Sequence, residues 1–162
     1  FDSMKYVEIM SKLRLDLEEN YKNALKNGEE VKVKTLRLIK SAIKDKDISL
    51  RSDGKKDGLS DEGILSLLQN LIKQRNESAE MYKKAGREKL VDSELKEIEI
   101  IKCFLPQQMN EDEIKDIINK IVEEENLGSI KEMGKLMGVL KSKYSGKIDM
   151  SVAGKLAKEV LK

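Results

Sequence analysis

The sequence contains no histidine, so the side chains available for acid, base or nucleophilic chemistry are one thiol, many carboxylates and many amines, besides the hydroxyls of Ser, Thr and Tyr. Without histidine, the chain lacks the commonest general base, the Ser-His-Asp triad and the commonest zinc ligand. Cys103 is the single cysteine, so it forms no disulfide within the chain, and a nucleophile there would have no histidine partner. Its position beside Phe104 on an expected helix favours a buried structural thiol, and we assign Cys103 no role.

Carboxylates form two groups along the chain, namely Glu94, Glu97 and Glu99, and the consecutive Glu123, Glu124 and Glu125. Three adjacent glutamates point in three directions around a helix, so they do not converge on one metal ion. We interpret both groups as solvated helix faces. Lys147 follows only one glycine, Gly146, and lacks the preceding spacing of a phosphate-binding P-loop. The sequence therefore predicts no catalytic residue, no metal site and no small-molecule cofactor.

Two glycines four residues apart, Gly134 and Gly138, are the sharpest local feature of the sequence. Inside a helix each costs about 1 kcal/mol relative to alanine, and their spacing puts both on one face. This pattern indicates that something approaches the face closely. Two explanations remain open, a neighbouring helix or an external ligand such as a nucleic-acid backbone or a partner peptide.

The distribution of charge is more informative than the net charge of +2. Residues 107–128 contain seven acids and two lysines, whereas residues 131–162 contain eight lysines and three acids, so the segment charge changes from −5 to +5. These lysines could neutralise phosphates, which would make an affinity for nucleic acid fall with salt. Alternatively, the two oppositely charged segments attract each other. Residues 31–56 form a second basic stretch, with nine Lys or Arg against three acids.

Hydrophobic periodicity predicts helices along the whole chain. Hydrophobic residues make up 39% of the sequence, charged residues 38% and aromatic residues only 4%, without the sustained alternation typical of strands. Helices are expected at about 4–27, 29–50, 60–84, 87–105, 111–126, 130–143 and 150–161. The apolar residues expected to face a core include Tyr6, Met10, Leu17, Leu25, Val31, Ile39, Leu90, Leu95 and Ile101.

Local signals predict where these helices begin and end. Gly28 occupies the position of a left-handed C-terminal cap, Ser60 that of an N-cap, and the pairs Asn110 with Glu113 and Ser129 with Glu132 have the spacing of capping boxes. Pro106, the only proline, disfavours helical geometry in the residue before it. We therefore predict an all-α protein, with a larger N-terminal helical bundle at residues 1–106 followed by a small three-helix C-terminal domain at residues 107–162.

The location predicted from composition is the cytoplasm. No run approaches 18 consecutive apolar residues, and the first residues lack the charged, apolar and small-residue order of a signal peptide. We expect no membrane partner.

Several segments together resemble the YqeY family. In the N-terminal part they are Thr35–Ile43, Lys73–Ser78, Ala85–Arg87, Leu90, Glu94, Glu97 and Leu105–Pro106. In the C-terminal part, Met133–Gly138, Gly146 with Lys147, and Leu156–Leu161 resemble the segment that this family shares with the C-terminal tail of the GatB subunit of the tRNA-dependent amidotransferase. Phe104 departs from the tyrosine expected before Leu105 and Pro106, which puts any role of that hydroxyl in doubt.

The resemblance implies a link to tRNA, because the amidotransferase tail helps to hold tRNA while other domains carry out the amidation. It implies nucleic-acid-binding residues in the C-terminal part: Gly134, Lys135 and Gly138, with Lys131, Lys141, Lys143 and Lys147 as neighbours. We therefore expect a non-catalytic tRNA-binding or accessory module. The alternatives are a protein interaction module, with an amidotransferase or synthetase subunit as partner, or a carbon-nitrogen ligase that uses glutamine as amido donor, a label that would be inherited from the relative.

Overall fold

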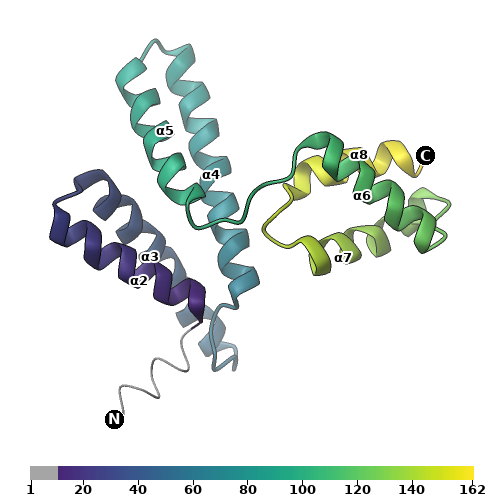
Figure 1. Cartoon of the computed structure of the whole chain (residues 1–162), viewed down its shortest axis with the longest axis horizontal. Coiled ribbons are helices and arrows are strands. Elements are labelled where there is room, and N and C mark those ends of the chain that lie inside the picture. The colour runs from purple at the N-terminus through teal and green to yellow at the C-terminus, as the bar shows by residue number, and fades with distance from the viewer. Residues whose placement is uncertain (1–10) are drawn as a thin grey trace. The chain divides into compact units, whose positions relative to one another are not determined.

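The computed structural model describes residues 11–162, and the regular structure of this part of the chain consists of helices without a strand (Figure 1). The prediction of an all-α fold is confirmed. Tyr6 and Met10, predicted to lie on the first helical stripe, fall outside the described residues. Within residues 11–162 the α-helices are α2 Lys12–Asn27, α3 Glu30–Ser52, α4 Asp61–Lys84, α5 Glu88–Lys102, α6 Glu111–Glu124, α7 Met133–Tyr144 and α8 Met150–Val160, and the 3-10 helix η1 spans Ile130–Glu132.

The chain divides into two compact units, with the division between Phe104 and Leu105. The N-terminal unit contains α2 to α5, and the C-terminal unit contains α6 to α8. The division falls close to Pro106, whose ring is incompatible with continuing a helix through that point. Each unit has its own buried apolar residues.

In the N-terminal unit, α2 packs along α3 and α4 packs along α5, and both α4 and α5 also contact α3 (Figure 1). Gly28 ends α2 in the left-handed region with a φ of 67°, as predicted. Ser60 caps α4 by accepting a hydrogen bond from the Gly63 amide at 3.1 Å, also as predicted. The fully buried apolar side chains of this unit are Leu36, Ile39, Ile64, Leu68 and Ile101.

Four apolar residues predicted to face this core are exposed instead. The exposed fractions are 49% for Leu25, 45% for Val31, 40% for Leu90 and 46% for Leu95. Leu25, Val31 and Leu90 lie within two residues of a helix end, and Val31 and Leu95 line an open groove between α3 and α5. Periodicity identifies the stripe on a helix, but it does not show how much of that stripe a neighbour covers.

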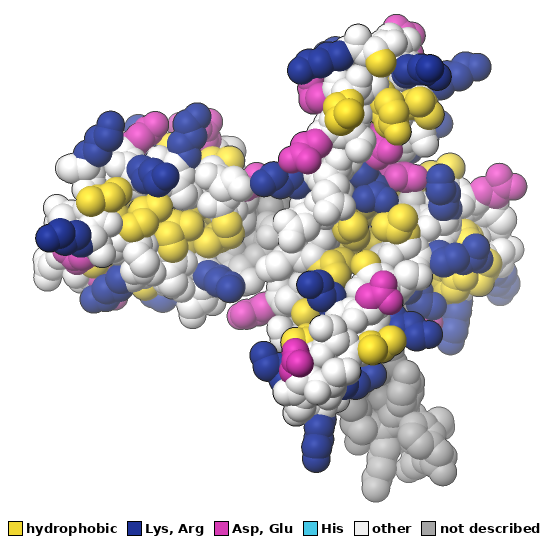
Figure 2. Space-filling view, turned by 180° about the vertical axis from the view of Figure 1, so that it is seen from behind, with side chains coloured by type: hydrophobic (Ala, Val, Ile, Leu, Met, Phe, Trp, Pro, Cys, Tyr) yellow, Lys and Arg dark blue, Asp and Glu magenta, His cyan; other side chains and the backbone are white. Residues whose placement is uncertain are grey.

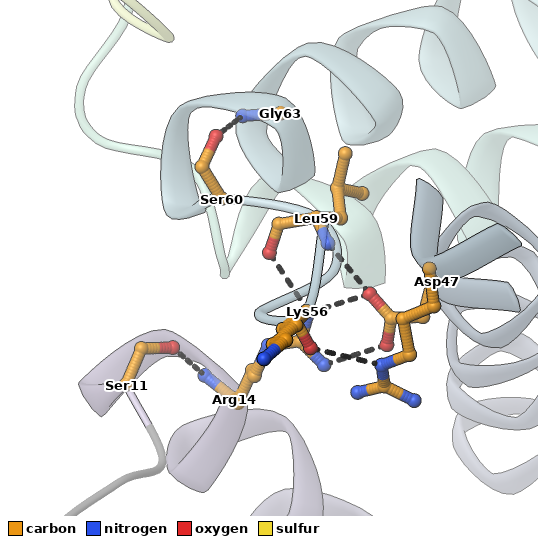
Figure 3. A network of polar contacts seen from close by, with 8 residues as sticks. Ser11, Arg14, Asp47, Lys56, Leu59, Ser60 and Gly63 are labelled. Carbon is orange, nitrogen blue, oxygen red and sulfur yellow. Dashed lines mark hydrogen bonds and ion pairs between the residues drawn. The ribbon is translucent and has the colours of Figure 1, made fainter. Parts of the chain in front are cut away.

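A half-buried ion pair joins α2, α3 and the loop before α4 (Figure 3). Asp47 accepts hydrogen bonds from Arg14 Nη1 at 2.9 Å, from Arg14 Nη2 at 2.8 Å and from the Leu59 amide at 2.7 Å. The Arg14 guanidinium also donates to the Leu59 carbonyl at 2.8 Å. The hydrogen bond from Arg14 is the largest influence on Asp47 and, against the opposing effect of burial, holds its pKa below the ordinary value.

Gly58 makes room for this carboxylate. Its φ is +72°, and a Cβ added there would clash with Asp47 Oδ1. The carboxylate cannot easily move aside, because Arg14 and Leu59 hold both of its oxygens. Both the backbone conformation and the close contact therefore require glycine at position 58.

The C-terminal unit is built from α6, α7 and α8, each in contact with the other two. The predicted cap at Asn110 is present, since its Oδ1 accepts from the Glu113 amide at 2.8 Å. The predicted cap at Ser129 is wrong, because its side chain makes no capping hydrogen bond. The chain forms η1 there instead, and the Gly128 amide donates to Glu132 Oε1 at 3.1 Å. The core residues without any exposure are Ile118, Leu136, Leu140, Ile148, Ala153 and Ala157.

Candidate nucleic-acid interface

Gly134 and Gly138 lie exposed on α7, and a Cβ added at either position would meet no atom within 4 Å. No helix of the C-terminal unit therefore approaches this face. Of the two explanations that the sequence left open, close packing by a neighbouring helix of this unit is contradicted. The face is left available to an external ligand.

The opposite side of α7 packs into the core of the unit, so the face with Gly134 and Gly138 points away from that core. Leu136 and Leu140 have no exposed area and contribute to the core of the unit. Gly134, Gly138 and Lys141 are separated by four and then three residues, so they lie on one stripe of the helix. We call these three residues the glycine face. It combines two positions without side chains and one exposed ammonium group.

Lys135 lies beside the glycine face and takes part in an ion pair with Glu125, the residue directly after α6. Its Nζ is 3.4 Å from Glu125 Oε2, and the two side chains are 58% and 43% exposed. Exposed pairs of this kind contribute about 0–1 kcal/mol, so a phosphate could compete for the lysine. Attraction between the acidic and the basic segment was the alternative to phosphate binding, and this pair is the one ion pair between these segments among residues 11–162.

The other three predicted lysines are not gathered on the glycine face. Lys143 follows Lys141 by two residues, which rotates its position by about 200° around the helix. Lys131 lies in η1, before α7 begins. Lys147 is exposed in the loop after α7, where its carbonyl accepts from the Met109 amide at 2.9 Å. Figure 2, which shows the C-terminal unit at the left, displays lysine side chains around a band of apolar ones.

Cys103 is exposed, so its assignment as a buried thiol is wrong. The residue caps the end of α5 rather than continuing its apolar stripe, and its thiol donates to the Glu99 carbonyl at 3.3 Å.

Among the described residues, no cluster of three or more Cys, Asp or Glu side chains could hold a metal ion. In the same part of the chain, none of the helices has both the length and the apolar content needed to cross a membrane.

Glu97 was predicted on a solvated face, but the structure buries it to 8% exposure. Its Oε2 accepts from Arg75 Nε at 2.9 Å, and its Oε1 lies 3.6 Å from Lys34 Nζ. The partners are far from Glu97 in the sequence, on α4 and α3, so helical spacing alone gave no signal for the contact. Glu97 connects three helices of the N-terminal unit and has a structural role.

The family of the chain follows from a comparison that covers nearly all of it. A family model described as "Yqey-like protein" matches residues 14–161. The chain belongs to the YqeY family. The match includes α3, α4 and α5 as well as the glycine face, so it spans both compact units.

Three curated relatives of this YqeY-family chain carry one name, "Altered inheritance of mitochondria protein 41, mitochondrial". The protein from Lachancea thermotolerans is 34% identical over 65% of this chain and 52% of its own length. The one from Vanderwaltozyma polyspora is 31% identical over 76% and 68%, and the one from Pyrenophora tritici-repentis is 26% identical over 94% and 81%. The chain thus spans about half the length of the Lachancea protein.

These relatives contradict the cytoplasmic location expected from composition, because each of them is named a mitochondrial protein. The expectation used the absence of a signal peptide and of a membrane span. Neither feature distinguishes a protein of the cytoplasm from one of the mitochondrial interior, because import depends on a removable targeting segment and not on the composition of the folded domain.

Proposed function

We propose that this YqeY-family chain is a non-catalytic tRNA-binding module that holds the RNA against the glycine face of α7. The observation that carries the proposal is the open face itself, with Gly134 and Gly138 exposed and no neighbouring atom within 4 Å of an added Cβ. Two glycines there cost the helix about 2 kcal/mol relative to two alanines. Since packing within the unit gives no reason for them, we infer that a bound ligand does.

The chemistry of the glycine face suits a sugar-phosphate backbone. A helix surface without side chains at two successive turns admits a bulky ligand close to the helix axis. Lys141 lies on the same stripe, and Lys135 lies beside it in a weak, exposed ion pair. Contacts between these ammonium groups and phosphates would release counterions, so the affinity should fall with salt. Lys131, Lys143 and Lys147 do not lie on this stripe, so they would add to the positive charge of the unit without forming the contact.

A second candidate is a protein-docking role for the same region. Ile130 is 50% exposed directly before α7, and Met133 and Met137 are only partly buried. Flexible methionine side chains adapt to different partner surfaces. The partner could be an amidotransferase or synthetase subunit. Direct carbon-nitrogen ligase chemistry receives no support from the side chains, because no histidine is present and no metal-binding cluster exists among the described residues.

A titration of total tRNA, followed by fluorescence anisotropy at low and moderate salt, tests the proposal. The relatives are named mitochondrial proteins, so the test should include mitochondrial tRNA beside cytoplasmic tRNA. Lys141→Glu should weaken binding, and Lys120→Glu on α6 provides a control with the same change of charge at another exposed position of the unit. Absence of binding at low salt would remove the RNA proposal. Protein complexes that survive nuclease treatment would support the docking role instead.

A further inference from the structure

The N-terminal unit contains a basic groove between α2 and α3, with a volume of about 490 Å³. Its cationic lining residues are Arg14, Arg37, Lys40, Lys44 and Arg51, and its acidic ones are Glu18 and Asp47. We call it the α2–α3 groove. The basic stretch at residues 31–56, noted from the sequence, supplies four of the five cations. The tRNA proposal for α7 gives this stretch no role.

Two of the five cations are neutralised by ion pairs inside the groove. Arg14 pairs with Asp47 at 2.8 Å, and Lys40 pairs with Glu18 at the same distance. Arg37, Lys44 and Arg51 have no carboxylate within ion-pair distance among the described residues, and all three are exposed. The groove therefore carries three exposed cationic side chains that are outside ion pairs. Of these, Arg51 also attracts the Asp47 carboxylate from a longer distance, and its Nε donates to the Lys56 carbonyl at 3.3 Å.

These three cationic residues lie in one row along α3. Arg37, Lys44 and Arg51 are spaced at intervals of seven residues, which is almost two helical turns, so they share one stripe of α3. With a rise of about 1.5 Å per residue, neighbouring cations are about 10 Å apart and the row extends over about 20 Å. A single phosphate or a mononucleotide would reach one of them. A ligand with repeating phosphates along a strand would reach all three.

Tyr21 orders the cations at one end of the groove. Its hydroxyl oxygen accepts from Arg37 Nη2 at 3.2 Å, and Lys40 Nζ lies 4.1 Å from the centre of its ring. Lys40 also pairs with Glu18 at 2.8 Å. Long cationic side chains lose rotamer entropy when they bind an anion, and holding them in place beforehand reduces that loss.

We propose that the α2–α3 groove is a second RNA-binding site, which contacts the sugar-phosphate backbone of a strand through Arg37, Lys44 and Arg51. The site lies in a different unit from the glycine face and uses different residues, so either can exist without the other. The contact is to phosphates alone, which predicts little preference for base sequence and a strong dependence on salt.

The test uses the full chain and a fluorescently labelled single-stranded oligouridylate of about 12 nucleotides, long enough to span the row of cations, with anisotropy measured over a range of salt concentrations. The double variant Arg37→Glu/Lys44→Glu should raise the Kd at low salt by at least about tenfold and reduce the slope of log affinity against log salt by about 1.4, for two lost phosphate contacts. Lys46→Glu is the matched control, because Lys46 is exposed on α3 but does not line the groove. Equal Kd values for the double variant and a double-charge control that combines Lys46→Glu with Lys120→Glu would overturn the proposal.

Two further measurements separate this site from the glycine face and from misfolding. Gly138→Leu should leave the affinity for the oligouridylate within about twofold, whereas it should weaken tRNA binding if the function proposed for α7 is correct. In the unmodified protein, bound oligouridylate should reduce acetylation of Lys44 but not of Lys46, measured by mass spectrometry. Equal acetylation of Lys44 with and without RNA would contradict the proposed site whatever the variants do.

Discussion

Arg14 on α2 and Asp47 on α3 form a double hydrogen bond, and the same carboxylate accepts from the Leu59 amide, so one buried group connects two helices and a loop (Figure 3). Asp47→Ala leaves both donors without their acceptor. We expect the free energy of unfolding to fall by about 2–3 kcal/mol. Urea denaturation measures it, with Asp45→Ala, an exposed position on the same helix, as the control. A loss for Asp47→Ala no larger than for Asp45→Ala would contradict a stabilising role.

The same pair predicts how stability depends on pH. Because the folded-state pKa of Asp47 lies below the ordinary value of 3.8, its contribution is complete above the unfolded pKa and is lost as the pH falls through the folded pKa. The difference in unfolding free energy between the native protein and Asp47→Asn should therefore be constant at about pH 5–7 and shrink below about pH 4. A difference that stays constant down to about pH 2.5 would argue against this pKa shift.

Gly58 and Gly54 offer a matched pair of loop glycines. Both have positive φ, +72° and +90°, but only at Gly58 would a Cβ contact the Asp47 carboxylate. Gly54→Ala should cost about 1–2 kcal/mol from backbone strain, and Gly58→Ala should cost about 1–3 kcal/mol more. Thermal or urea unfolding measures both. Combining Gly58→Ala with Asp47→Ala should remove most of the extra loss, and strict additivity of the two changes would contradict the steric explanation.

The glycine face predicts opposite effects on stability and on binding. Gly134→Ala and Gly138→Ala should each raise the free energy of unfolding by about 1 kcal/mol, because neither methyl group meets another atom and alanine favours the helix. Each should also weaken tRNA binding, since the ligand would be held further from the helix. Gly128→Ala serves as a control outside α7. A gain in stability without any loss of binding would mean that the glycines serve another purpose.

Features that depend on a few consecutive residues could be predicted from the sequence. The caps at Gly28, Ser60 and Asn110 are of this kind, because the partner of each cap is within one helical turn. The family resemblance likewise needed only short segments. The exposure of Leu25 and Cys103 could not be predicted, because it depends on which neighbouring helix covers a stripe and where a helix ends.

At the candidate site, too, the sequence could not show which helix face a neighbour covers. The sequence identified Gly134 and Gly138 and indicated their common face, but it could not decide whether a helix covers that face. That answer required the positions of Leu136 and Leu140, which turn the glycines away from the core. The contacts between Arg14 and Asp47 and between Arg75 and Glu97 join residues that are 33 and 22 positions apart, and charge patterning along one helix gave no sign of either.

Substitutions of Lys141 and Lys143 test whether the affinity for tRNA depends on where a lysine lies on α7, and not only on the net charge. Both are exposed and lie two residues apart, but only Lys141 shares the stripe of Gly134 and Gly138. Lys141→Glu should raise the Kd for tRNA several times more than Lys143→Glu at the same salt concentration. Circular dichroism should show unchanged helicity for both. Equal effects would indicate a diffuse electrostatic attraction in place of a defined contact on the glycine face.

The central claim is that the open face of α7 holds tRNA, and the affinity of Gly138→Leu for total tRNA at moderate salt tests it most directly. Gly138 is exposed and has no neighbour within 4 Å of an added Cβ, so the leucine side chain changes the surface without changing the charge of the unit. We predict unchanged helicity and a Kd raised at least about tenfold, which corresponds to about 1.4 kcal/mol. A Kd within about twofold of that of the unmodified protein would contradict the claim.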